Sequence, residues 1–282
     1  MSQDQSSITL FRSLLTMPPK GMIKTMNSCN ITMNSRDTRG LTLLILASML
    51  GNSNKIKECL ALGAEINAQQ HSKVPIESYT EKGNTALIWA IANANVDAAK
   101  LLINQGADPN IVSLAHSYEE ERVGGNTALT LAAAKGYSHR QDKYATRPPM
   151  SEVIDLLIEK GADLNYRNFA GKSAIDYAIF HRDNDLINIL VSRGVKIGQE
   201  HIALLEISHE NVSTELNKDC HAFTILPQRE WESRSAETHK ILTNAMAKQV
   251  VIETMATSPI PNPSATLVNT TSKPVLVSRD PF

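Results

Sequence analysis

Apolar residues along the chain fall into short segments with helical spacing, and between residues 39 and 198 these segments come in pairs. The first segment of a pair is almost continuously apolar, as in the run Leu41–Leu50. The second carries a leucine-rich stripe, as at Ala99, Leu101 and Leu102, or at Val153, Leu156 and Leu157. Segments of this length and period predict paired helices joined by polar loops.

Four of these pairs follow one pattern, in segments Arg39–Ala68, Lys82–Asn110, Gly124–Asn165 and Ala170–Gly198. The interval from the first Thr or Ser to the Gly that ends the second helix is 21 residues in three of them: Thr42 to Gly63, Thr85 to Gly106 and Ser173 to Gly194. The remaining interval, Thr127 to Gly161, is 34 residues, which indicates an insertion of 13. Such a period is typical of a repeat architecture, in which one unit buries its apolar face only against the next.

Polar and glycine positions of the repeat have definite structural roles. A hydroxyl side chain precedes each first helix, where it can accept hydrogen bonds from backbone N–H groups that lack a helical partner. These residues are Thr42, Thr85, Thr127 and Ser173. A glycine follows each second helix, where a left-handed backbone conformation ends the helix. These glycines are Gly63, Gly106, Gly161 and Gly194.

The pattern resembles the ankyrin repeat, with a Thr-Pro-Leu-His-x-Ala-like helix start and a Gly-Ala-Asp-x-Asn end. The helix starts that carry the resemblance are Thr42–Ala47, Thr85–Ala90, Thr127–Ala132 and Ser173–Ala178, and the ends are Gly63–Asn67, Gly106–Asn110 and Gly161–Asn165. The family's Pro and His are replaced throughout, and the fourth repeat lacks the final Asp and Asn. The resemblance implies an all-α ankyrin-repeat solenoid of stacked helix pairs, with two lengthened β-hairpin fingers and helical end caps.

The two lengthened fingers are the candidate partner-binding elements. From the last Asn of one repeat to the loop Gly of the next, the interval is 6 residues for Asn165 to Gly171, but 16 for Asn67 to Gly83 and 15 for Asn110 to Gly125. Both long connections contain Ser-Tyr followed by acidic residues. Exposed aromatic side chains on loops make good contacts, so the candidates are Tyr79, Tyr118, Glu119, Glu120 and Glu121. The alternative is that both are tolerated surface insertions.

The 13-residue insertion in the third repeat includes a basic stretch that ends at Pro148 and Pro149. We expect it to project from a side of the solenoid away from the finger tips. Its cations could meet an acidic partner or a phosphate, or the segment could be a solvated loop.

The ends of the chain depart from the repeat, and the expected domains are residues 1–35, 36–198, 199–256 and 257–282. The first contains a capping helix, Ser7–Met17, which Pro18 and Pro19 stop, followed by a linker. The repeats lie at about 37–69, 82–112, 124–167 and 169–198. Residues 199–256 form a helical cap or accessory region, with a short helix at 200–207 and an amphipathic helix at 235–256. Its expected apolar face holds Ile241, Leu242, Ala245, Met246, Gln249 and Val250. Residues 257–282 read as a flexible tail with five prolines.

Composition narrows the classes of partner and compartment. The 282 residues carry 28 basic and 29 acidic side chains, a formal net charge of -1 that gives no general attraction to nucleic acid or to an anionic membrane. Three cysteines, Cys29, Cys59 and Cys220, do not form a disulfide framework. No secretory signal or membrane span stands out. We therefore expect a soluble, cytoplasmic monomer, or a protein secreted into a host cell cytosol.

Candidate chemistry is sparse. A phosphate-binding glycine loop, a zinc-protease motif and paired CxxC are all missing from the sequence, and we expect no cofactor and no metal. His201, His209, Cys220 and His221 include zinc-ligand types without a common spacing, and Cys220 could act as a nucleophile only with a base nearby. His181 is expected in a loop or on the surface. Trp89 either packs between repeats or lines the concave surface and anchors a partner.

Two hypotheses about function follow from the resemblance. In the first, the chain is a non-enzymatic protein-interaction module that binds a protein partner through the groove and the fingers. The acidic finger tips then favour a basic patch on that partner. In the second, the array is a host-targeted effector that delivers a small catalytic or modifying segment, residues 199–256.

Overall fold

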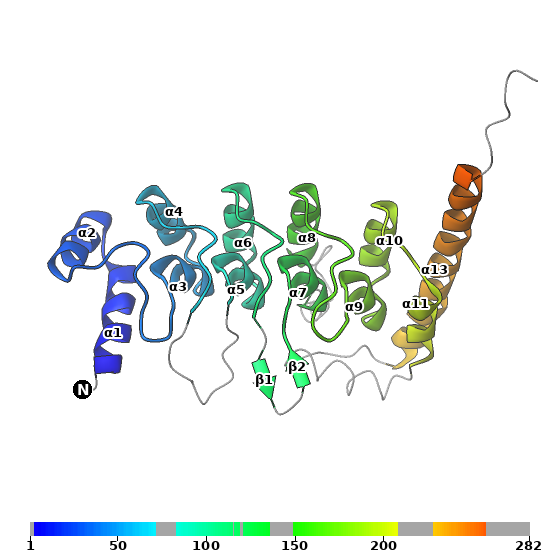
Figure 1. Ribbon diagram of the computed structural model, residues 1–282, viewed down its shortest axis with the longest axis horizontal. Helices are drawn as coiled ribbons and strands as arrows, with labels where there is room; N and C mark the ends of the chain where they lie inside the picture. The colour runs from blue at the N-terminus through cyan, green and yellow to red at the C-terminus, as the bar shows by residue number, and fades with distance from the viewer. Residues whose placement is uncertain are drawn as a thin grey trace, which may run out of the picture.

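The structure, a computed structural model, describes residues 3–71, 83–114, 116–118, 121–135, 149–207 and 228–257. Its helices stack in two rows (Figure 1). The lower row contains α3 (Leu43–Met49), α5 (Ala86–Ala92), α7 (Ala128–Lys135) and α9 (Ala174–Phe180). The upper row contains α4 (Ser53–Ala61), α6 (Val96–Asn104), α8 (Pro149–Glu159) and α10 (Asn184–Ser192). The chain is therefore an all-α repeat solenoid, as the pattern predicts.

Hydroxyl caps start three of the four lower helices as predicted. The Oγ1 atoms of Thr42, Thr85 and Thr127 each accept a hydrogen bond from the backbone N–H three residues on, at 3.3 Å. Ser173 behaves differently, because its hydroxyl donates to the carboxylate of Asp176 at 2.7 Å. Asp176 also accepts from the Ser173 backbone N–H at 2.8 Å, so the carboxylate caps this helix.

The N-terminal region is a fifth helix pair, which corrects the expectation of one helix and a linker. Helix α1 (Gln3–Thr16) is followed by α2 (Pro19–Ser28). A proline can begin a helix because the backbone N–H that it lacks would have no hydrogen-bond partner in the first turn. Asn30 ends α2 with a φ of 54°, in the place that glycine holds in the other repeats, where Gly63 has a φ of 85°. The buried Lys55 of α4 donates to the Met17 carbonyl at 2.8 Å and so holds this pair against the next.

A ladder of asparagines runs along the loops that follow the upper helices. Asn34 accepts from the backbone N–H of Glu65 at 2.9 Å, and Asn67 accepts from Asp108 at 3.0 Å. Asn110 then accepts from Asp163 at 2.8 Å and donates to the carbonyl of Gly161 at 3.0 Å. Each rung satisfies backbone groups of the following repeat, and the first rung comes from the α1–α2 pair. The repeat geometry therefore extends to the N-terminal end of the stack.

The apolar core is continuous along the whole stack. The lower helices contribute fully buried branched residues, such as Ile45, Ile88 and Ile175, and their alanines lie between neighbouring repeats. The core begins at Phe11 in α1 and ends at Ala245 near the C-terminus. Burial of apolar surface stabilises the fold by about 25 cal/mol per Å² removed from water. A single helix pair buries too little of this surface to be stable, and stacking on its neighbours buries the rest.

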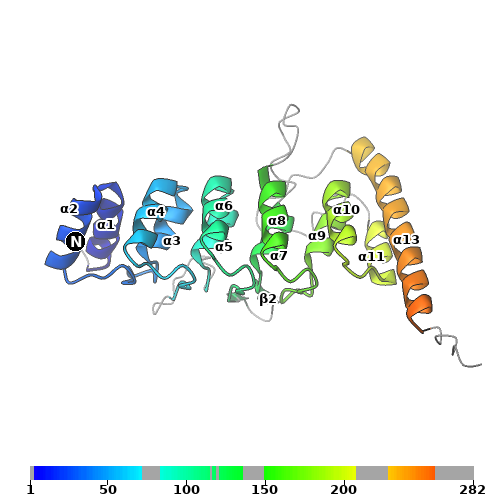
Figure 2. The same ribbon diagram turned by 90° about the horizontal axis from the view of Figure 1, so that it is seen from above.

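The C-terminal end is closed by a short helix and a long one. Helix α11 (Gln199–Ala203) leads into a 3₁₀ turn, η1 (Leu204–Glu206), and the 30-residue α13 (Gln228–Thr257) crosses the end of the array, as Figure 2 shows from above. Its buried face consists of Trp231, Thr238, Leu242 and Ala245, at spacings of three, four and seven residues. Val250, expected on this face, is 57% exposed, because α13 has turned it away from the array.

One pair of strands lies among the described residues. Strand β1 (His116–Tyr118) pairs antiparallel with β2 (Glu121–Val123), with Tyr118 opposite Glu121. The hairpin projects below the lower helices in Figure 1. Most of the preceding connection, residues 72–82, lies outside the described residues.

Candidate partner-binding face

The roots of the fingers expose two large apolar side chains at equivalent positions of neighbouring repeats. Leu114 lies just before β1 and is 49% exposed, and Phe169 lies one repeat further on and is 44% exposed. Each rests on the loop glycine of the preceding repeat: a Cβ on Gly83 would lie 2.5 Å from the Leu114 side chain, and one on Gly125 would lie 2.5 Å from the Phe169 ring. Both glycines have positive φ, so they provide the turn and the space for the apolar residue.

Trp89 packs at the base of the first finger. It is partly buried against the core, and its Nε1 donates to the Oε1 of Gln70 at 3.2 Å. Gln70 is buried and donates through Nε2 to the carbonyl of Arg39 at 3.2 Å. Trp89 therefore connects α5 to the residue from which the first finger leaves, in a packing role that leaves part of its ring open to solvent.

The remaining predicted contact residues belong to the hairpin or lie outside the described residues. Tyr118 is in β1 and Glu121 is in β2, and the register places them opposite each other. Tyr79, Glu119 and Glu120 are outside the described residues. The strand register thus pairs the backbones of Tyr118 and Glu121, and Leu114 precedes β1 in the chain.

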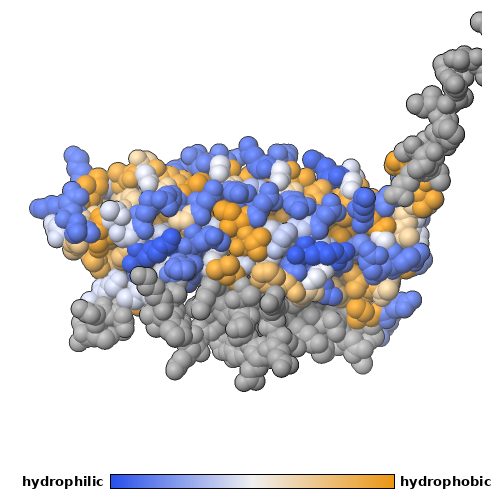
Figure 3. Space-filling view, in the orientation of Figure 1, coloured by the Kyte–Doolittle hydropathy of each residue, from blue (hydrophilic) through white to orange (hydrophobic). Residues whose placement is uncertain are grey.

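Positive charge flanks the finger roots. Arg36 donates to the carbonyls of Gly40 and Gln69, so its guanidinium meets backbone rather than a carboxylate there. Lys172 places its ammonium 4.7 Å from the centroid of the Phe180 ring. Figure 3, in the orientation of Figure 1, shows an orange area between two deep blue areas on this face of the molecule.

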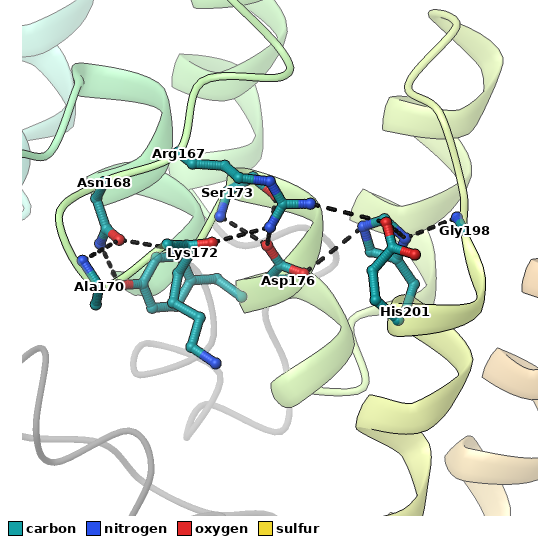
Figure 4. Close-up of polar contacts among 11 residues, drawn as sticks. Arg167, Asn168, Ala170, Lys172, Ser173, Asp176, Gly198 and His201 are labelled. Carbon is teal, nitrogen blue, oxygen red and sulfur yellow. Dashed lines mark hydrogen bonds and ion pairs between the residues drawn. The ribbon is translucent and has the colours of Figure 1, made fainter.

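A polar network joins the last repeat to the C-terminal end (Figure 4). Arg167 donates to Asp176 at 3.0 Å and to the Gly171 carbonyl at 2.8 Å. The buried ring of His201 accepts through Nδ1 from the N–H of Gly198 at 2.9 Å and places Nε2 3.7 Å from the second carboxylate oxygen of Asp176. The network therefore links the starts of α9 and α11.

Ser173, Asp176 and His201 do not form a nucleophilic triad. In such a triad the histidine contacts the serine hydroxyl, and the carboxylate orients the far side of the ring. Here the hydroxyl of Ser173 donates to the carboxylate instead, and Asp176 lies between the other two residues. All three side chains are buried. The arrangement caps a helix and offers no activated nucleophile.

His181 is buried, which corrects the expectation of a loop or surface position. It ends α9, and its Nε2 lies 3.0 Å from the carbonyl oxygen of Ala134 in α7, one repeat away. Desolvation lowers its pKa to about 4, against 6.5 for a free histidine, although the contact with the Ala134 carbonyl opposes part of the shift. The imidazole is therefore neutral at pH 7 and acts as a link between repeats.

Arg182 is among the largest fully buried side chains of the described residues, and sequence reasoning did not single it out. Its guanidinium lies 4.1 Å from the centroid of the Trp231 ring and donates to the Ser235 hydroxyl at 2.9 Å. It also donates to the carbonyls of Ile179 and Leu205. Burial lowers its pKa to about 10. Both aromatic and hydroxyl partners belong to α13, so Arg182 holds that helix against the last repeat.

The cysteines divide by environment. Cys59 is buried, and desolvation raises the pKa of its thiol to about 11, while Cys29 is exposed. Cys220, His209 and His221, named as candidate zinc or nucleophile residues, lie outside the described residues. Within the part of the chain that the structure describes, no three histidine, cysteine or carboxylate side chains gather as they would around a metal ion. Likewise, none of the described helices is long and apolar enough to cross a membrane.

The binding-face residues that sequence reasoning missed are Leu114 and Phe169. The sequence contained a signal for both positions. Leu114 directly follows the buried Ser113, and Phe169 directly follows the buried Asn168, at equivalent places in the two loops. An apolar residue at this place in the loop packs on a loop glycine and stays partly exposed. Its exposure could have been inferred from the repeat alignment.

Comparisons with known proteins agree with this geometry. The model for ankyrin repeats in three copies matches residues 10–113, and the model for a single ankyrin repeat matches residues 124–169. Together they cover about half of the chain. The repeat solenoid is therefore an ankyrin solenoid, and the chain belongs to the ankyrin repeat family. The first match includes most of the α1–α2 pair, in line with its repeat-like closing loop.

Several curated proteins share part of the array. The chain is 25% identical over 170 residues to Protein glp-1 of Caenorhabditis elegans, covering 48% of this chain and 12% of that protein. It is 28% identical over 138 residues to the Putative ankyrin repeat protein L86 of Acanthamoeba polyphaga mimivirus, covering 45% and 22%. It is 34% identical over 68 residues to the Probable E3 ubiquitin-protein ligase XBOS33 of rice, covering 24% and 11%. The chain spans less than a quarter of the length of each of these proteins.

Proposed function

We propose that this protein is a non-enzymatic protein-interaction module that binds a protein partner on the finger side of its ankyrin array. Ankyrin repeats are generally modules for protein–protein interaction, and the family membership supports that class. The observation that supports the finger side is the pair Leu114 and Phe169. These are two large apolar side chains left open to solvent at neighbouring finger roots.

The aromatic and acidic residues of the fingers complete the proposed face. Tyr79 and Tyr118 would supply contact area, and the acidic run Glu119–Glu121 would meet a basic patch on the partner. Trp89 would stiffen the base of the first finger through its hydrogen bond to Gln70. A rigid root under a projecting loop lowers the entropy lost on binding.

We assign residues 36–198, with the α1–α2 pair, to the binding module and residues 199–256 to its C-terminal cap. The described part of that region supports a cap, because α11 and α13 pack against the last repeat and the buried face of α13 is used for that contact. The rival hypothesis of a modifying segment has less support for the same reason. The viral ankyrin relative is compatible with action in a host cytosol.

Cross-linked capture from cell lysate, followed by mass spectrometry, tests this proposal. The baits are the full-length chain, a variant with residues 72–80 and 115–122 deleted, and a control with residues 138–146 deleted from the insertion between α7 and α8. We expect a partner that the full-length chain and the control retain and the finger-shortened chain loses. Equal capture by all three baits would contradict the proposal.

A further inference from the structure

The loop residues at the finger roots form one row across the stack. His71 donates from its backbone N–H to the carbonyl of Gly40 at 3.3 Å, and Phe169 donates to Gly124 at 3.2 Å. Leu114 packs on Gly83, as Phe169 packs on Gly125. Each of these residues therefore crosses to the preceding repeat, so their side chains follow one another along the array. We call this row, with the cations that border it, the finger-root strip. It comprises Arg36, His71, Leu114, Arg167, Phe169 and Lys172.

The strip is apolar toward the C-terminal half and basic at both ends. Arg36 borders it on the N-terminal side, and Arg167 and Lys172 border it next to Phe169. Within the described root residues 36–40, 69–71, 112–114 and 167–172, the sole acidic side chain is Asp37, which is buried and held by Arg39 at 2.7 Å. Next to Phe169, Arg167 is paired with Asp176 at 3.0 Å and lies 4.0 Å from the exposed Glu200. The positive charge that these roots offer a partner is therefore that of Arg36 and Lys172, in contrast to the acidic finger tips.

We propose that the finger-root strip binds an extended acidic segment of the protein partner, with two apolar side chains seated on Leu114 and Phe169. This inference rests on the proposed function and names the chemistry of one part of the partner. Carboxylates of the segment would meet Arg36 at one end and Lys172 at the other, by charge complementarity. A partner that engages the whole face would then present acidic and apolar groups to the roots and basic groups to the tips.

The spacing of the strip specifies the segment. Neighbouring helices pack about 10 Å apart, so equivalent residues of adjacent repeats have about that separation. A polyproline-like chain returns to the same face every three residues and rises about 3.1 Å per residue. Its side chains three residues apart would therefore reach Leu114 and Phe169 together. The expected motif is two apolar residues at positions i and i+3 with acidic residues outside them.

Selection of a phage-displayed library of 12-residue peptides on the full-length chain tests the motif. We expect enriched peptides to carry the i, i+3 apolar pair with acidic flanks. Fluorescence anisotropy with the synthesised peptide then measures the effect of Leu114→Ser and Phe169→Ser. Each should weaken binding about tenfold, the loss expected when roughly half the burial of such a side chain is removed. Leu50→Ser is the matched control, because Leu50 is 68% exposed in the turn between α3 and α4.

Charge is tested separately, so that the outcome does not depend on the apolar variants alone. Arg36→Gln and Lys172→Gln should each weaken peptide binding, and rising salt should reduce the difference from the unmodified chain. Enrichment of basic peptides, absence of enrichment, or equal binding by the Leu114 and Leu50 variants would overturn the inference. Suppose that the Leu114→Ser and Phe169→Ser chains still capture the lysate partner and that only finger shortening abolishes capture. The proposed peptide site on the finger-root strip is then wrong, while the proposed binding of a partner by the finger side is retained. If finger shortening has no effect either, both fail.

Discussion

The guanidinium of Arg182 stacks on the indole of Trp231 at 4.1 Å and so joins the turn after α9 to the first helical turns of α13. The cation is fully buried, and its described partners are an aromatic ring, a hydroxyl and two backbone carbonyls. A desolvated cation over an aromatic face is held more strongly than one at an exposed site. The contact is one of several that hold α13 against the last repeat, together with the hydrogen bonds from Asn184 to Glu237 and from Thr238 to Asn184.

Trp231→Ala should loosen the attachment of the first turns of α13 to the last repeat. Removing a buried tryptophan costs about 3–5 kcal/mol, and here it would also leave Arg182 buried without its ring. Urea unfolding should show the loss of stability, and hydrogen exchange should show faster exchange across α10 and α13. Lys240→Ala, on the exposed side of α13, serves as the control and should change neither. Equal exchange in the two variants would mean that α13 docks by other contacts.

Acid should weaken the link between α7 and α9 through His181. Its folded pKa of about 4 lies below the free value of 6.5, so the unfolded chain binds the proton more readily. The stabilisation is complete above about pH 6.5 and is lost as the pH falls toward 4. The linkage amounts to about 3 kcal/mol at pH 4. Urea unfolding of His181→Gln at pH 7 and pH 4 should show a smaller pH dependence than the unmodified chain. His239→Gln, at an exposed position, should leave it unchanged.

The cysteines should differ in their reaction with a maleimide at pH 7. Cys29 is exposed and should label rapidly in the folded chain. Cys59 is buried with a thiol pKa of about 11, so it has almost no thiolate and should label only after unfolding. The labelling is measured in a Cys220→Ser variant, so that Cys29 and Cys59 are the two cysteines that can react. Mass spectrometry of the labelled peptides reads the result, and rapid labelling of Cys59 would contradict the packing of α4.

A methyl group on Gly125 should disturb the binding face more than one on Gly63. Both glycines have positive φ, so each alanine variant carries a backbone cost of about 1 kcal/mol. At Gly63 the new Cβ meets nothing within 4 Å, whereas at Gly125 it would overlap the Phe169 ring. Gly125→Ala should therefore lower the thermal midpoint further and weaken partner capture. Similar midpoints for both variants would show that Phe169 moves aside at little cost.

The repeat could be predicted from the sequence because its signals are local. Thr42, Thr85 and Thr127 cap helices by contacts three residues away, and Gly63 requires its conformation whatever the surroundings. Helix α2 was missed because Asn30 replaces the glycine that marks a repeat end, although asparagine also adopts the left-handed conformation.

The binding face and the end of the array depend on tertiary contacts, which the local pattern does not contain. His181 stands in a turn that reads as polar, and the carbonyl of Ala134 in the preceding repeat makes its burial possible. Arg182 is buried only because α13 supplies Trp231 and Ser235 from about 50 residues away. Val250 fits the apolar face of α13 by spacing, yet it is exposed there. Leu114 and Phe169 are exposed because loop glycines, not core residues, lie beneath them.

Hydrogen exchange of the full-length chain, with and without the captured partner, tests the central claim that the finger side is the binding face. We predict that the partner slows exchange at the finger roots, in residues 69–71, 111–126 and 167–172, and leaves α4, α6 and α10 unchanged. Protection confined to those upper-row helices or to α13, with the finger roots unaffected, would contradict the account.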